Sequence, residues 1–389
     1  LTYAKTWGRH RFDVVGGYTM EGYLNKSVAN TYIKFPTDVL GMDNLSQGTA
    51  QPAVTSIEEF FTMSFLGRVN YVYNDKYIFT ASFRADGSSK FLGDNQFGYF
   101  PSGAVAWRVS QENFLRDVPW LSNLKLRASW GLTGNNRIGG SSAYAALYNS
   151  ANTGYLFNGS LVYGYQPARV ENRDLKWETT RQVDVGLDLP VFNNRINLTV
   201  DYYHKKTKDL LLYSDLATSS GYQSAYLNIG SVQNQGWEFS LNTTNIDHKH
   251  FRWYTSFNIS FNRNKVLALN SGQEYMLSKP NWYQRYDEDQ YIARIGEPAS
   301  MIYGYVYDGV YQNEDFYYVD GKYVVREGVP GQIGSLTNIK PGHTKYRDLN
   351  GDGKIDANDR TVIGNPNPKH FGGFTNSFEW YNFDLSVFF

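Results

Sequence analysis

Apolar and polar residues alternate with period two along much of the chain, the pattern of a strand with one dry and one wet face. In 61–73 the odd positions are mostly Phe, Met, Val and Tyr, and the even positions are mostly Thr, Ser, Arg and Asn. The same alternation recurs in further segments, 77–86, 124–133, 182–189, 196–203, 237–242, 253–262 and 374–389. We therefore predict an all-β fold of long antiparallel strands.

A soluble sandwich and a membrane barrel both produce this alternation. Three features favour the barrel. The predicted strands run to about 13–18 residues, whereas strands of soluble sheets usually have about five or six. Their polar positions are rich in Asn, Ser, Thr, Asp and Tyr, as expected of a hydrated lumen. Aromatic residues gather near the predicted strand ends, where outer-membrane barrels carry interfacial girdles: Tyr71, Tyr73, Tyr77, Trp177, Phe192, Trp253, Trp380 and Tyr381.

Short and long connections alternate along the chain. The short ones contain Gly8-Arg9, Asn74-Asp75, Asn193-Asn194, 247–249 and Tyr381-Asn382; 111–121 joins them as a short helical turn. The long ones are 27–57, 87–97, 135–175 and 209–228. Because short turns of outer-membrane barrels lie in the periplasm and long loops lie outside the cell, this alternation orients the predicted strands.

The orientation also assigns the longest connection. The strand at about 250–266 runs outward, and the strand at about 371–380 runs inward if Tyr381-Asn382 is a periplasmic turn. We therefore expect 267–370 to be one long extracellular excursion. With this assignment the chain supplies about twelve strands, and 1–389 forms part of one barrel.

Composition narrows the class of protein. The 37 Lys and Arg balance 37 Asp and Glu, which argues against a nucleic-acid partner, since such partners need a basic face. The absence of cysteine removes disulfides and thiolate sites, and a 17% aromatic content argues against disorder. The sequence contains no run of 18 apolar residues, so it predicts no transmembrane helix. The chain begins with Leu1 and ends inside an apolar alternation, so we expect it to be part of a longer protein.

The sharpest motif is an aspartate-rich loop at 348–359. Oxygen-bearing side chains occupy positions 1, 3, 5, 9 and 12 of this twelve-residue segment, Gly353 occupies position 6 and Ile355 position 8. This is the spacing of an EF-hand calcium loop. We predict a structural calcium site whose ligands come from Asp348, Asn350, Asp352, Lys354, Asp356 and Asp359. The alternative is an ordinary Asp/Asn/Gly-rich surface turn, because position 12 is Asp rather than Glu and helical flanks are missing.

No catalytic pattern is recognisable in the sequence, so we expect that the protein is not an enzyme. His248 and His250 lie in a predicted tight turn. Two solvated histidines are a simpler interpretation of this pair than a metal site. Aromatic residues on the predicted extracellular loops are candidates for stacking on a sugar or peptide: Tyr155, Phe157, Tyr163, Tyr165, Trp282, Tyr283 and Tyr286. Packing of the loops against one another is the alternative.

Several of these segments together resemble the SusC/RagA family of TonB-dependent outer-membrane transporters of Bacteroidetes. One is the segment 124–135, which ends in Ser129-Trp130-Gly131-Leu132-Thr133-Gly134-Asn135. Others, in the family's order, are 77–91, 99–108, 175–180, 234–238, 296–312, 348–359 and 363–389. The resemblance covers the chain from about residue 60 onward.

The resemblance implies a plugged barrel of 22 strands, of which this chain would supply about twelve, in the outer membrane of the cell. It implies TonB-dependent import of glycans or peptides together with a SusD-like surface lipoprotein. Contacts with outer-membrane lipid are implied as well, and coupling to the TonB complex would pass through a region absent from this sequence. The alternative is a cell-surface glycan-binding adhesin or lectin-like β protein without transport.

Overall fold

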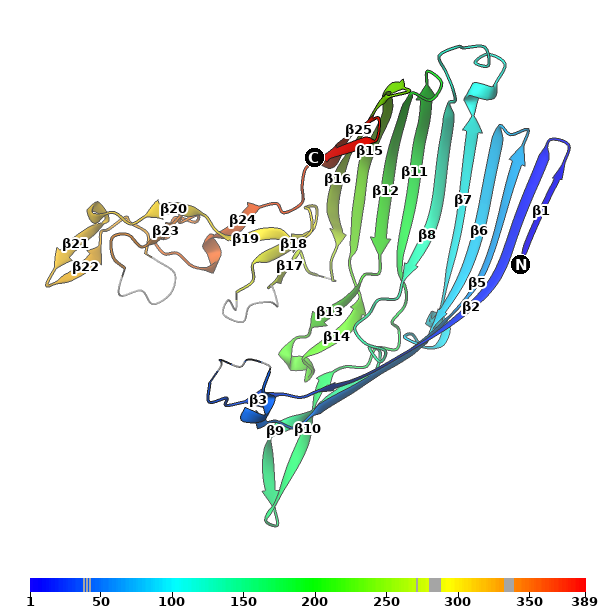
Figure 1. Cartoon of the computed structure of the whole chain (residues 1–389). Coiled ribbons are helices and arrows are strands. Elements are labelled where there is room, and N and C mark those ends of the chain that lie inside the picture. The colour runs from blue at the N-terminus through cyan, green and yellow to red at the C-terminus, as the bar shows by residue number, and fades with distance from the viewer. Residues whose placement is uncertain (38, 40, 42, 271, 280–287, 332–338) are drawn as a thin grey trace. The chain divides into compact units, whose positions relative to one another are not determined.

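Twelve antiparallel strands form the main sheet of the chain (Figure 1), as predicted. The computed structural model describes residues 1–389 except 38, 40, 42, 271, 280–287 and 332–338. The sheet is open, with β1 and β26 at its edges. In sheet order its strands are β1 (Thr2–Trp7), β2 (His10–Ala29), β5 (Val54–Tyr73), β6 (Tyr77–Ser88), β7 (Phe97–Arg108), β8 (Lys125–Asn135), β11 (Glu178–Val191), β12 (Ile196–Lys208), β15 (Ser231–His248), β16 (Phe251–Ala268), β25 (Phe371–Trp380) and β26 (Phe383–Phe388).

The register gives the sheet one apolar and one polar face, because residues paired across antiparallel strands point to the same side. Phe83 of β6 stacks on Tyr99 of β7 on the apolar face, where Phe65 and Phe83 are each about half exposed. On the polar face the hydroxyl groups of Ser82 and Ser102 lie 2.6 Å apart. An apolar face with half-exposed aromatic rings is suited to contact with lipid.

The short connections lie at one end of the strands and the long connections at the other, as expected for antiparallel neighbours (Figure 1). Asn74 and Asp75 join β5 to β6 with φ of 51° and 54°, and Asn193 between β11 and β12 has φ 53°. Asn and Asp tolerate this left-handed conformation better than most residues. The sequence therefore specifies tight turns at this end.

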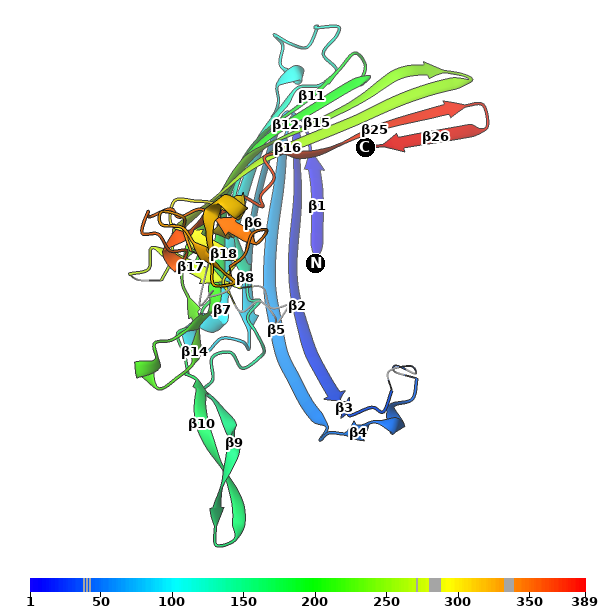
Figure 2. The ribbon, with the colours of Figure 1, turned by 90° about the vertical axis from the view of Figure 1, so that its left-hand side faces the viewer.

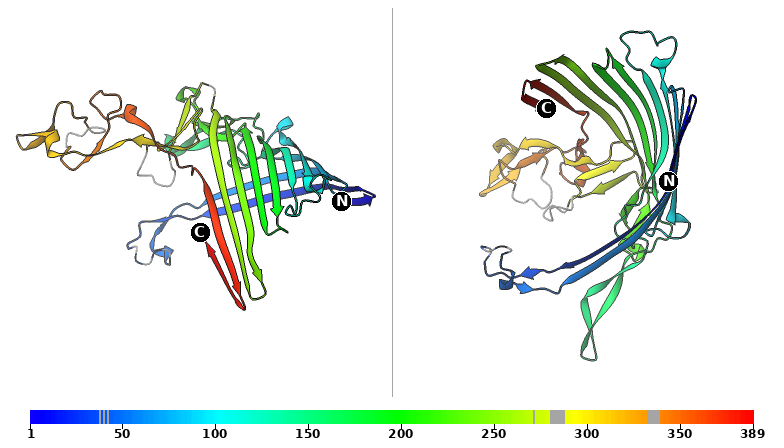
Figure 3. Two further views of the ribbon diagram at one scale, coloured as in Figure 1. Left: turned by 90° about the horizontal axis from the view of Figure 1, so that it is seen from above. Right: turned by 45° about the vertical axis from the view of Figure 1, so that its right-hand side comes forward.

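By its internal packing the chain divides into two compact units. Unit 1 comprises Leu1–Ile229, Phe239–Phe257 and Phe374–Phe389, and unit 2 comprises Gly230–Glu238 and Asn258–Gly373. Within unit 1 the strands from β2 to β12 lie side by side in a curved sheet (Figure 3). Unit 2 holds the strands between β16 and β25: β17 (Tyr275–Ser278), β18 (Tyr291–Arg294), β19 (Met301–Tyr305), β20 (Tyr307–Val310), β21 (Phe316–Val319), β22 (Lys322–Val325), β23 (Thr344–Tyr346) and β24 (Arg360–Gly364).

The strands within unit 2 form small sheets of their own. One contains β17, β18, β19 and β24, and the pairs β20–β23 and β21–β22 form two more. The apolar run 301–311 thus supplies β19 and β20 rather than a strand of the twelve-stranded sheet. A compact core of Tyr311, Phe316 and Ile339 stabilises the middle of this excursion.

The long connections of unit 1 contain regular strands where the sequence analysis placed loops. These are β3 (Tyr32–Ile33), β4 (Thr49–Ala50), β9 (Leu147–Phe157), β10 (Ser160–Arg169), β13 (Leu211–Asp215) and β14 (Ser224–Asn228). β9 and β10 form a long hairpin (Figure 2), and their sheet has the order β13-β14-β10-β9. The helices in the part of the chain that the structure describes are 3₁₀ turns of three or four residues, and none is long and apolar enough to cross a membrane.

A hydrophobic cluster ties these connections together. Phe91 and Leu175 are fully buried in it, and the ring of Trp177 lies 5.5 Å from those of Phe91 and Phe100. The indole N–H of Trp177 donates to the carbonyl of Gln96 at 3.1 Å. The expectation that Trp177 belongs to an interfacial girdle is therefore wrong, because its ring stabilises the packing of the connections.

Candidate functional site

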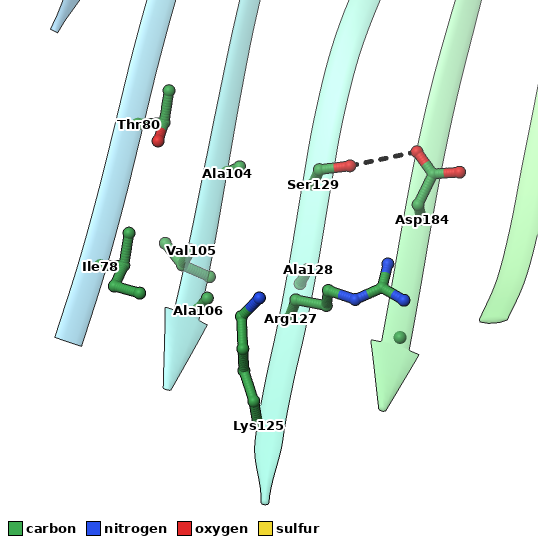
Figure 4. A pocket seen from close by; sticks show the side chains of 11 residues that line it. Ile78, Thr80, Ala104, Val105, Ala106, Lys125, Arg127, Ala128, Ser129 and Asp184 are labelled. Carbon is green, nitrogen blue, oxygen red and sulfur yellow. Dashed lines mark hydrogen bonds between the residues drawn. The ribbon is translucent and has the colours of Figure 1, made fainter. Parts of the chain in front are cut away.

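A cluster of charged side chains lies on the polar face of β8, β11 and β12. Figure 4 shows Lys125 and Arg127 of this cluster on β8. Both terminal nitrogens of Arg127 bind Asp201, at 2.7 and 2.8 Å. The same guanidinium binds Asp188, with Nε and Nη2 each 3.2 Å from a carboxylate oxygen. Lys125 Nζ lies 3.5 Å from Asp188. Arg127 thus joins three neighbouring strands through two fork-shaped ion pairs.

The absence of a side chain at Gly186 makes room for this arrangement. Gly186 is paired with Arg127 on β8 and with Asp201 on β12. A Cβ at this position would lie 2.3 Å from Asp201 Oδ1 and 2.6 Å from Arg127 Cζ. The guanidinium therefore crosses the strand where only glycine leaves space.

The cluster borders a pocket of about 290 Å³, lined in part by Thr80, Ala104, Ser129 and Asp184. The hydroxyl of Ser129 donates to Asp184 at 3.1 Å. The polar face continues as hydroxyl and amide ladders, for example Thr80 to Asn70 at 2.9 Å. Such a wall offers donors and acceptors to water and polar solutes, as in the lumen of a barrel.

Sequence reasoning did not single out this cluster. Lys125, Arg127, Asp184, Asp188 and Asp201 all occupy polar positions of the alternation, which was the available signal. Their association depends on strand register, because Arg127 and Asp201 are 74 residues apart in the chain.

The first half of the aspartate loop is folded around Asp348. Its two carboxylate oxygens accept the backbone N–H groups of Gly351 and Gly353, at 2.6 and 2.7 Å. Both glycines have left-handed φ, of 76° and 81°, which other residues seldom adopt. Asn350 accepts the N–H of Asp352 at 3.0 Å, and Asp352 accepts that of Lys354 at 2.9 Å.

The second half of the loop closes on Asp359, which is fully buried. Its carboxylate accepts the N–H groups of Leu349 and Asp356, each at 2.8 Å, and Ile355 is 2% exposed. Burial raises the pKa of the Asp359 carboxyl, but backbone N–H donors and the neighbouring Asp348 side chain outweigh burial and hold this pKa below its ordinary value. Asp359 thus joins the two ends of the loop.

The loop carboxylates point to backbone donors in this structure. Within the part of the chain that the structure describes, no three His, Cys, Asp or Glu side chains are grouped so that they could hold a metal ion. Asp356, for example, accepts the N–H of Asn358 at 2.8 Å. The loop has the compact turns of a calcium-binding segment without convergence of its acidic side chains.

Four of the candidate substrate-contacting aromatics lie on the β9–β10 hairpin. Tyr155, Phe157, Tyr163 and Tyr165 are all more than half exposed. The turn is Asn158-Gly159, with φ of 48° and 76°, and this dipeptide between apolar runs is a strong hairpin signal that the sequence analysis overlooked. The other three candidates, Trp282, Tyr283 and Tyr286, lie outside the described residues.

An open sheet of long antiparallel strands, apolar with exposed rings on one side and polar on the other, is the wall of an outer-membrane β-barrel. The model of the family described as "TonB dependent receptor-like, beta-barrel" matches residues 2–355. The chain belongs to this family.

The comparisons with individual proteins agree. A TonB-dependent receptor of Formosa agariphila is 39% identical over 391 residues, covering 100% of this chain and 37% of that protein. The TonB-dependent receptor SusC of Bacteroides thetaiotaomicron is 33% identical over 397 residues, covering 99% and 36%. The structure of the RagAB peptide transporter matches with TM-score 0.76 and 27% identity, covering 100% of this chain and 40% of that one. The resemblance to SusC and RagA is confirmed, and the chain spans less than half the length of these relatives.

Proposed function

We propose that this chain forms part of the barrel wall of a TonB-dependent importer that carries nutrient oligomers across the outer membrane. The observation that carries the proposal is similarity over the full chain to TonB-dependent receptors, together with a polar face built of charged and hydroxyl side chains. Such a face supports passage of a hydrated solute rather than of a lipid.

The proposed partners are a SusD-like surface lipoprotein, which captures the substrate, and the TonB complex, which supplies energy. Support for the lipoprotein comes from the similarity to SusC and to RagAB, which was solved in closed-closed and open-open states. Substrates proposed are oligosaccharides or peptides. The name of RagAB as a peptide importer supports the second class, and exposed rings on the β9–β10 hairpin suit either class by stacking.

Uptake by living cells tests the function. Cells that carry the intact gene should accumulate labelled oligosaccharides or oligopeptides, and deletion of the gene or of TonB should abolish the accumulation. Purification of the intact protein should recover a lipoprotein in about equal amount. Surface binding of the label that persists without TonB, with no accumulation in any strain, would identify an adhesin and refute import.

We also propose that the loop 348–359 binds a structural calcium ion. The spacing of oxygen side chains and the left-handed Gly351 and Gly353 support it, because a twelve-residue loop of this spacing with glycine at position 6 is the form that binds calcium in EF-hands. Asp352 and Asp356 would have to turn from backbone donors toward the ion.

Calorimetry on the intact protein after chelation tests this proposal. The wild-type protein should bind one calcium ion, and Asp348→Asn with Asp352→Asn should abolish binding. Asp320→Asn is a matched control, since Asp320 lies in the turn of another hairpin with φ 47°, where Asn is tolerated. Absence of calcium uptake by the wild-type protein would refute the site and leave import unaffected.

A further inference from the structure

Three cations gather on the apolar side of β11 and β12, close to the end with long connections. Arg181 is paired directly with Lys206, and Lys208 is paired with Thr179. The same register places Arg181 on the face that carries Val183 and Val185, since alternate residues of a strand share a face. These cations therefore point outward, away from the Arg127 cluster.

The outward cations differ from the Arg127 cluster in their pairing. Among the described residues, Arg181, Lys206 and Lys208 form no ion pair; the salt bridges of β11 and β12 involve Asp188 and Asp201 on the polar face. Like charges that lie directly opposite each other across two strands destabilise the sheet. An arrangement of this kind is expected where an external anion compensates the repulsion.

The position of the cations along the strands indicates which anion this is. On β11 the outward positions below them are apolar, from Leu189 through Leu187 and Val185 to Val183. On β12 the outward residues below Lys206 are His204, paired with Val183, and then Tyr202 and Val200. From Leu189 to Arg181 the strand extends roughly 26 Å, at about 3.3 Å per residue, and a tilted strand of that length crosses most of the apolar band of a barrel, which is about 25 Å tall. Arg181 and Lys206 thus lie at the border between hydrocarbon and water.

We propose that Arg181, Lys206 and Lys208 form a binding site for the phosphate groups of a lipid in the outer leaflet of the membrane. A guanidinium binds phosphate through two parallel hydrogen bonds, whereas ammonium groups act as point charges. Acyl chains of the same lipid would cover Val183 and Val185 directly below. A free phosphate ion would gain nothing from that apolar surface, so the geometry favours the lipid.

This site is distinct from the import pathway, because it faces away from the polar wall. It requires only that the sheet lies in the outer membrane, so its failure and the failure of the import proposal are distinguishable. Exposure supports accessibility: Arg181 and Lys208 are exposed, and Lys206 is half-buried.

The test uses the intact protein, delipidated in detergent, with lipid A, chemically dephosphorylated lipid A and inorganic phosphate as separate probes. Lipid A should raise the melting temperature of the wild-type protein and be retained in native mass spectra. Dephosphorylated lipid A and inorganic phosphate at the same concentration should not. The triple variant Arg181→Gln, Lys206→Gln, Lys208→Gln should bind lipid A roughly 100-fold more weakly, about fivefold for each lost charge.

Lys205→Gln is the matched control, because Lys205 is the neighbour of Lys206 on the polar face and lies over the Tyr203 ring; lipid affinity should be unchanged. Arg181→Gln alone, with an expected fivefold loss, keeps the test decisive if the triple variant does not fold. Equal lipid A binding by wild-type and variant proteins overturns the proposal. So does equal stabilisation by inorganic phosphate, which would indicate a free-anion site.

Discussion

On the polar face of β11 and β12, Asp188 and Asp201 hold Arg127 between them at 2.7 to 3.2 Å. On the apolar face of the same two strands, Arg181 and Lys206 lie opposite each other without a carboxylate partner among the described residues. The two sets belong to the same pair of strands and differ in neighbours rather than in residue type. On the polar face the Arg127 cluster balances its charges within the protein, whereas the rim of the apolar face leaves Arg181 and Lys206 for the surroundings.

This difference teaches that a charge on a barrel strand must be judged by the face that carries it. On the polar face, an ion pair limits the attraction of the wall for any one solute, because the charges of the pair already balance each other. Outside, an unbalanced charge at the border of the membrane is available to lipid phosphates.

Reversing the charge of Asp201 should have the largest effect on the stability of the polar face. Asp201→Lys removes the two hydrogen bonds to Arg127 and sets two cations side by side. The free energy of unfolding should fall by about 2–3 kcal/mol, less than for a fully buried pair, because the Arg127 side chain is 34% exposed. Urea unfolding of the intact protein measures this change. Asp117→Lys, in an exposed turn, should cost less than about 1 kcal/mol; equal losses would contradict a special role of Asp201.

Two glycines of the sheet offer a smaller contrast between the faces. Gly186→Ala should destabilise the protein by about 1.5 kcal/mol, because the new methyl group meets Asp201 and Arg127. Gly67→Ala should be neutral or stabilising by about 0.5 kcal/mol, since nothing lies within 4 Å of the added Cβ. Thermal unfolding of both variants checks the prediction, which fails if Gly67→Ala is the more damaging change.

The end with short turns contains a paired charge that can be titrated. Glu112 accepts hydrogen bonds from the Tyr77 hydroxyl at 2.7 Å, Lys76 at 3.1 Å and the Trp107 indole at 3.1 Å. These donors, Tyr77 foremost, hold the pKa of the Glu112 carboxyl below its ordinary value. A lowered pKa stabilises the folded state above the unfolded value of about 4.3, and the stabilisation is lost as pH falls through the folded pKa.

Glu112→Gln should therefore lower stability slightly at pH 7 and remove part of its dependence on pH below about 4. Stability measured from pH 3 to 7 for both proteins tests the sign. A wild-type protein that gains stability relative to the variant on acidification would contradict it.

The smallest expected effect is a gain in stability on the apolar face. Lys206→Glu places a carboxylate opposite Arg181, so in detergent without lipid the free energy of unfolding should rise by about 0.5 kcal/mol. In membranes that contain lipid A, the same change should weaken lipid retention. Lys205→Glu on the polar face serves as control for the added negative charge, and a matching gain there would contradict the role of Arg181.

Particular elements show how far the sequence could be interpreted. Alternation correctly predicted strands and their faces, and the spacing of polar turn residues correctly placed the short connections. Trp177 was misplaced, because an aromatic residue near a strand end can pack against loops as well as against lipid. The Asn158-Gly159 hairpin was missed although its signal was present in the sequence.

The aspartate loop shows the same limit at a candidate site. Its spacing and glycines predicted a compact turn, and the structure contains one, with Asp359 buried at its closure. Whether the acidic side chains converge depends on rotamers and on the competition between backbone N–H groups and a cation, which spacing alone does not determine.

The sequence by itself determined which side of each strand is dry, because the pleat of a strand fixes a period of two regardless of its partners. It also determined the alternation of tight and long connections, through residues that accept left-handed backbone. Only the tertiary structure decided which charges meet. Register aligns residues such as Arg127 and Asp201, 74 positions apart, and the same register separates Arg181 and Lys206 from every carboxylate on the opposite face.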